Sequence, residues 1–192
     1  TLALGFNAGI LAPMSAPHSD AERAVEQTAR ERDLYRALLE LGDGESDVGA
    51  LLHGVLDVLR DLTRAERLYV QAGRDLQDAP PYWAAVGSSS RDLDEVRTHL
   101  SRSILRSALD RGETVETACA LTDARFDAAG SVQANRVGAV ICAAIGGDAE
   151  LGVLYIQGER GGGGLHRDAA RLVGATARAI APTIAREVAR AR

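Results

Sequence analysis

The sequence contains no lysine: all 22 basic residues among its 192 are arginine. A Walker-type phosphate loop requires a lysine that reaches the phosphates, and a protein-kinase core requires a strand lysine for a similar purpose. Schiff-base enzymes require an amine that can lose its proton, which arginine does not do in proteins. These three classes of enzyme are therefore excluded.

Aromatic residues and cysteines are also scarce. With one Trp, four Tyr and two Phe, the core must be built mainly from aliphatic side chains. The two cysteines, Cys119 and Cys142, are too few for a disulfide framework, which favours a reducing compartment and a cytoplasmic location. The net charge of −5 argues against a nucleic-acid partner, because nucleic-acid binding needs a basic face.

The first nineteen residues differ in character from the rest. Residues 1–19 are mildly apolar, are broken by Gly, Pro13 and Pro17, and have no positive charge before the apolar run. This pattern disfavours a signal peptide, and the run is too short to span a membrane. We therefore expect an N-terminal arm or linker over 1–19, no membrane partner, and a single domain over 20–192.

Helical and strand patterns alternate along that domain. Apolar residues recur at helical spacing over 20–41, 48–62, 101–110 and about 166–192. Ser46 or Asp47 is expected to cap the second of these helices and Ser101 the third, whereas Pro182 is expected to kink the last.

Strand patterns occupy the middle of the chain. They cover 67–71, 82–86, 114–119, 139–145 and 151–156, and a short helix is expected over 132–136. The order of these segments predicts an α+β fold with a central antiparallel sheet of five or six strands, flanking N- and C-terminal helices, and helices mainly on one face.

Short motifs in these segments occur in an order that resembles a GAF domain, a PAS-related sensory fold. The motifs are Ser101–Ile104, Arg111–Val115, Leu121–Phe126, Ser131–Val132, Val140–Cys142 and Leu151–Ile156, followed by the terminal helix. Their rhythm is most similar to GAF domains found in front of sigma-54-dependent transcription activators and in related bacterial signalling proteins. Three positions depart from that pattern: Ala143 replaces a proline, Gln157 an acidic residue and Leu165 an aromatic one.

The resemblance implies a non-catalytic sensor domain with a small-molecule pocket between the sheet and segment 90–136. No metal or cofactor is predicted, and the ligand is unknown. The candidate ligand-binding residues are Trp83, Ile104, Cys119, Phe126, Arg136, Val140, Cys142 and Tyr155, with Val132 beside them. Because strand residues alternate, Val140, Cys142 and Tyr155 are expected to share one face. The alternative is that these side chains simply fill a core.

Two arginines offer a way to bind an anion. Arg125 and Arg136 flank Phe126, and an arginine fork suits a carboxylate or a phosphate. The alternative is a structural ion pair with Asp123 or Asp127. The lysine-dependent signature of cyclic-nucleotide GAF domains is excluded.

The resemblance also implies partners. The helices over 20–41 and 166–190 are expected to pair across a homodimer, and an output domain of the parent protein (an ATPase, DNA-binding or kinase module) is expected to receive the signal. Two other functions stay open. One is a thiol-dependent reductase similar to GAF-fold methionine sulfoxide reductases, which would use Cys119 and Cys142. The other is a purely structural dimerisation module.

Overall fold

A computed structural model describes residues 20–44, 47–88, 92–126, 130, 132, 137–146, 151–158 and 164–190. The expected N-terminal arm, most of the short helix over 132–136 and the candidate residue Arg136 lie outside the described residues.

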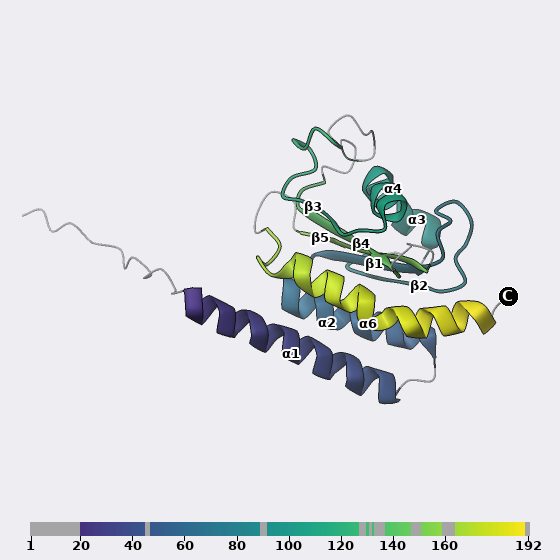
Figure 1. Cartoon of the computed structure of the whole chain (residues 1–192). Helices are drawn as coiled ribbons and strands as arrows, with labels where there is room; N and C mark the ends of the chain where they lie inside the picture. Colours follow the sequence, from purple (N-terminus) through teal and green to yellow (C-terminus); the bar gives the residue numbers. More distant parts are fainter. Residues whose placement is uncertain are drawn as a thin grey trace, which may run out of the picture.

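Five antiparallel strands form one sheet in the order β2-β1-β5-β4-β3, which confirms the predicted α+β class (Figure 1). The elements are α1 (Asp20–Gly44), α2 (Val48–Thr63), β1 (Arg67–Ala72), β2 (Trp83–Val86), α3 (Leu93–Thr98), α4 (Arg102–Arg111), β3 (Val115–Thr117), β4 (Val140–Ile145), β5 (Gly152–Gln157) and α6 (Ala169–Arg190). The sequence analysis missed α3, because six residues are too few to show a helical period.

Local capping explains where two of the helices begin. The Asp47 carboxylate accepts hydrogen bonds from the backbone N–H groups of Gly49 and Ala50 at the start of α2. The Ser101 hydroxyl accepts one from Ile104 at the start of α4, and that helix ends where Gly112 adopts a left-handed conformation with φ 66°. The expected caps at Asp47 and Ser101 are confirmed.

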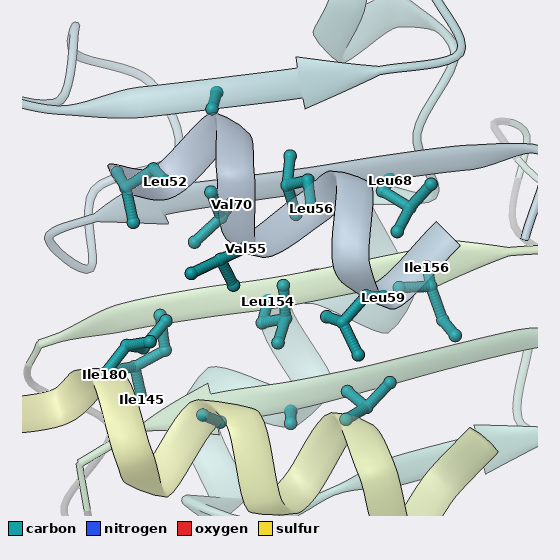
Figure 2. Packing of buried hydrophobic residues seen from close by; sticks show 14 of the residues in the cluster. Leu52, Val55, Leu56, Leu59, Leu68, Val70, Ile145, Leu154, Ile156 and Ile180 are labelled. Atoms are coloured by element: carbon teal, nitrogen blue, oxygen red, sulfur yellow. The ribbon is translucent and has the colours of Figure 1, made fainter. Parts of the chain in front are cut away.

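The first core lies between the sheet and helices α2 and α6. Figure 2 shows side chains of α2, among them Leu56 and Leu59, directed toward Leu154 and Ile156 of β5, with Ile180 of α6 in the same layer. All five side chains are at most 4% exposed. Removing this apolar area from water is the main stabilising contribution to this half of the molecule.

A second core lies on the opposite face, beneath α3 and α4. The alternation of side chains along β5 assigns Val153 and Tyr155 to the second core and Leu154 and Ile156 to the first. All six residues of β5 are buried as a result.

Helix α1 forms an outer layer against α2 and α6 (Figure 1). Leu34 is its fully buried side chain, and an ion pair joins Glu31 to Arg171 of α6. Two of its apolar side chains, Val25 and Leu39, remain 69% exposed. Helix α6 is continuous across Pro182.

The α2 cap can be tested by Asp47→Ala. This substitution should lower the free energy of unfolding by about 1 kcal/mol, because two backbone donors lose their acceptor. Asp61→Ala is the matched control, since Asp61 lies in the last turn of the same helix and its side chain is 77% exposed. It should change the stability by less than about 0.5 kcal/mol. Urea unfolding of both variants measures the difference, and equal losses would refute the assignment of the cap.

Candidate functional site

The structure brings most of the candidate residues together on the second-core face. Ile104, Phe126, Val140, Cys142 and Tyr155 are buried in the second core. Cys142 lies directly opposite Tyr155 across β4 and β5, so the expected shared face is confirmed.

The remaining candidates lie at the edge of this cluster or outside it. Trp83 is half-buried and packs against the second core, as does the neighbouring Ala85. Cys119 is half-buried beyond the end of β3. Ligand binding by these residues stays a prediction.

Tyr155 supplies a polar group inside this otherwise apolar core. Its hydroxyl donates a hydrogen bond to the Gln157 side-chain oxygen over 3.0 Å. Burial raises the pKa of Tyr155 well above its usual value, so the phenol stays protonated and remains a hydrogen-bond donor at neutral pH.

Two buried donors beside Tyr155 lack acceptors. Nη1 of Arg67 and the side-chain nitrogen Nε2 of Gln157 are inaccessible to solvent and have no hydrogen-bond partner among the described residues. Arg67 and Gln157 face each other across β1 and β5. The sequence analysis missed both as site residues. The signal was the two-residue alternation, which places them on the same face as Tyr69 and Tyr155.

Arg97, unlike the half-buried Arg67, is a buried arginine whose guanidinium finds several acceptors within the protein. Arg97 of α3 is 5% exposed, and its guanidinium forms no ion pair with any carboxylate of the described residues. The guanidinium donates over 3.0 to 3.4 Å to the Tyr69 hydroxyl, the Gln71 side-chain oxygen and the carbonyls of Asp75, Gln77 and Asp78. These bonds fix the connection between β1 and β2, so Arg97 is a structural residue. Its planar array of five N–H donors suits this task better than an ammonium group would.

Arg125 is also engaged by the protein. Its guanidinium donates to both carboxylate oxygens of Asp123, with the shortest distance 2.6 Å, and to the Glu116 carbonyl over 2.8 Å. These bonds hold the pKa of Asp123 far below its usual range. The structural ion pair is therefore the arrangement that the fold adopts, and Arg125 is not available as the expected anion fork.

The two cysteines have different environments. Burial raises the pKa of the Cys142 thiol strongly, since that side chain is 0% exposed. A hydrogen bond from Thr122 lowers the pKa of the partly exposed Cys119 thiol. The thiolate is thus strongly disfavoured at Cys142, and it forms more readily at Cys119 than in an ordinary cysteine.

A pocket lies elsewhere on the molecule. It measures about 390 Å³ and lies between the α4–β3 connection, β4 and α6, with Glu113, Ala143, Gly174 and Arg178 in its wall. Its lining includes none of the candidate residues. Over the described part of the chain, no group of three His, Cys, Asp or Glu side chains is placed to hold a metal ion. None of the described helices is long and apolar enough to cross a membrane.

Solved structures with a similar architecture include GAF domains and a reductase. That of a phosphoenolpyruvate-protein phosphotransferase from Coxiella burnetii has a TM-score of 0.63 at 14% identity, covering 88% of this chain and 98% of the other. Its counterpart from Acinetobacter has a TM-score of 0.62 at 13% identity, covering 86% and 97%. The free methionine-R-sulfoxide reductase from Neisseria meningitidis has a TM-score of 0.53 at 15% identity, covering 91% and 99%.

These similarities show the fold: the chain adopts the GAF-domain fold over its sheet and helices. No family model matches the sequence, and no curated protein matches it. The fold is compatible with signalling domains and with a reductase alike, so the function must be argued from the residues of the site.

Alkylation can test the contrast between the two cysteines. In the native protein, iodoacetamide should modify Cys119 alone, with a pH midpoint lower than that of an ordinary thiol, because a lowered pKa gives more thiolate at each pH. Cys142 should react only after unfolding. Thr122→Val should move the midpoint for Cys119 upward, since it removes the hydrogen-bonding hydroxyl. Peptide mass spectrometry gives both rates, and equal native rates for the two thiols would contradict the structure.

Proposed function

We propose that this chain is a non-catalytic, cytoplasmic sensor domain that binds a small molecule on the second-core face and signals through its terminal helices. The motif resemblance to GAF domains of sigma-54-dependent activators supports a role in bacterial transcription regulation. The output module is then an ATPase, DNA-binding or kinase domain of the parent protein.

The observation that carries this proposal is the sharing of β4 and β5 between the two cores. Cys142 and Tyr155 lie in the second core, while Ile141 and Ile156, next to them in the chain, lie in the first core. Helix α6 packs on β4 from the first-core side. Because packed cores respond to a change of volume by shifting their neighbours, a ligand beside Tyr155 would displace β4 and β5 and thereby move α6.

Such a signal requires that the ligand bind one arrangement of α6 more tightly than another. Helix α6 is suited to carry the shift, since it spans Ala169–Arg190 and is joined to α1 by the Glu31–Arg171 ion pair. A second ion pair, between Glu26 of α1 and Arg167 at 3.0 Å, joins α1 to the turn that precedes α6.

Native mass spectrometry of the purified chain tests ligand binding. We expect a stoichiometric extra mass in gentle ionisation that disappears under denaturing conditions in the same sample. A bare mass, together with no thermal shift from any member of a metabolite library, would refute the sensor proposal and leave the structural dimerisation module.

We further propose that α1 and α6 mediate a homodimer. The exposed apolar side chains Val25 and Leu39 are separated by fourteen residues, close to four helical turns, so they lie on the same side of α1. A second copy of this chain would cover them.

Light scattering at micromolar concentration tests the dimer. The wild-type chain should have twice the mass of its sequence, and Val25→Glu with Leu39→Glu should give a folded monomer, because charged side chains cannot be buried unpaired at an interface. Glu22→Gln with Glu40→Gln is a control on the same helix. A monomeric wild-type chain would overturn the proposal.

A thiol-dependent reductase is the second candidate. It is favoured by the lowered pKa of Cys119 and by the similarity in fold to the Neisseria reductase. We place it second because Cys142 is fully buried with a raised pKa and is unsuited to attack or resolve a disulfide.

A further inference from the structure

Two of the four buried side-chain atoms without a hydrogen-bond partner in the described protein lie side by side on the sheet. They are Nη1 of Arg67 and Nε2 of Gln157, on directly paired residues of β1 and β5. The other two, on Asp168 and Arg171, belong to residues of the first turn of α6 and the loop before it. Buried donors almost always have an acceptor, so a neighbouring pair without one calls for an explanation.

The charge near this pair is not balanced. Arg67 forms no ion pair with a described carboxylate, and its cross-strand neighbour Gln157 is neutral. Tyr155 is kept in its neutral form by burial and uses its hydroxyl to donate to the Gln157 oxygen. The nitrogen of the Gln157 amide is thereby left for a different acceptor, and it lies beside a guanidinium for which the described residues supply no anion.

We infer that Arg67 and Gln157 bind the carboxylate of a small organic acid whose apolar part lies against the second core; this rests on the proposed sensor function. A carboxylate has two oxygens and one negative charge. It can therefore accept from the arginine and from the amide at the same time, and it neutralises the single cation. Val140, paired with Gln157 on its other side, gives the adjoining surface an apolar character.

Among the described residues, Arg67 is the cation paired with Gln157, and its single charge distinguishes between two kinds of anion. A phosphate dianion would leave one negative charge unpaired in a buried setting, which is unfavourable. Neither Arg97 nor Arg125 supplies a second positive charge. Arg97 already donates to oxygens of the protein, and Arg125 is paired with Asp123. The carboxylate is therefore the better match.

The experiment is a titration of the full chain, ¹⁵N-labelled, with benzoate, acetate and inorganic phosphate at constant ionic strength. Benzoate should cause saturable shifts of the Gln157 side-chain amide signals, acetate weaker ones, and phosphate only non-saturating ones. Saturable shifts with phosphate alone would overturn the carboxylate assignment, as would no saturable shift with any of the three anions.

Two variants separate binding from stability. Arg67→Met keeps the length of the side chain without its charge, and Gln157→Glu provides Arg67 with an internal carboxylate. Each should weaken benzoate binding by about tenfold or more, since a charge-assisted hydrogen bond is lost or pre-empted. Gln157→Glu should also raise the melting temperature of the ligand-free protein. Because the Gln157→Glu variant is expected to be more stable than the wild type, its benzoate affinity can be measured even if Arg67→Met fails to fold.

Arg102→Met is the control, because Arg102 is an exposed arginine on α4. It should leave benzoate affinity unchanged. Equal affinity in wild type, Arg67→Met and Gln157→Glu would overturn the inference. A ligand retained in native mass spectrometry that is neutral, and whose retention does not depend on Arg67, would also overturn it while leaving the sensor proposal standing.

Discussion

Burial of β4 and β5 on both faces is the constraint on which the rest of the structure depends. Strands of an antiparallel sheet often have one face in water, but here every residue of β5 is buried. The molecule must therefore supply two separate apolar layers, one from α2 and α6 and the other from α3, α4 and the segment around Phe126. With so few aromatic residues, Leu, Ile, Val and Ala fill most of both layers. A polar group on these strands has no access to solvent and depends on a partner within the layer.

The buried Arg97 and the half-buried Arg67 show two responses to this constraint. Arg97 satisfies its guanidinium with side-chain and backbone oxygens, and it orders the β1–β2 connection in doing so. Arg67 does not, and one of its terminal nitrogens has no acceptor in the described protein. Both solutions cost desolvation of a cation. For Arg97, hydrogen bonds within the protein offset this cost. For Arg67, we infer that hydrogen bonds to a bound ligand offset it.

Local signals in the sequence were sufficient for most of the fold. The caps at Asp47 and Ser101, the paired strands β1 and β2, and the alternation that groups Val140 with Tyr155 depend on neighbours a few residues apart. Helix α3 was missed because it is shorter than two turns.

The site was only partly predictable, because its polar members become neighbours through pairing distant in sequence. Arg67 and Gln157 are ninety residues apart along the chain, and each taken alone is a polar residue at the boundary of a strand. Their importance emerges only from the register of β1 against β5. For Arg125 the sequence left two alternatives open, and the ion pair with Asp123, two residues away, is the one that the fold adopts.

The proline within α6 has a mechanical consequence. Proline has no N–H group, so the helix lacks one rung of its hydrogen-bond ladder around Pro182. The residues before it, through Ile180, are largely buried against the sheet, whereas those after Ile184 are progressively exposed. Bending stiffness is therefore lowest close to where the helix leaves the support of the sheet. A small tilt of the packed segment would be delivered to whatever follows the helix as a change in direction more than as a translation along its axis.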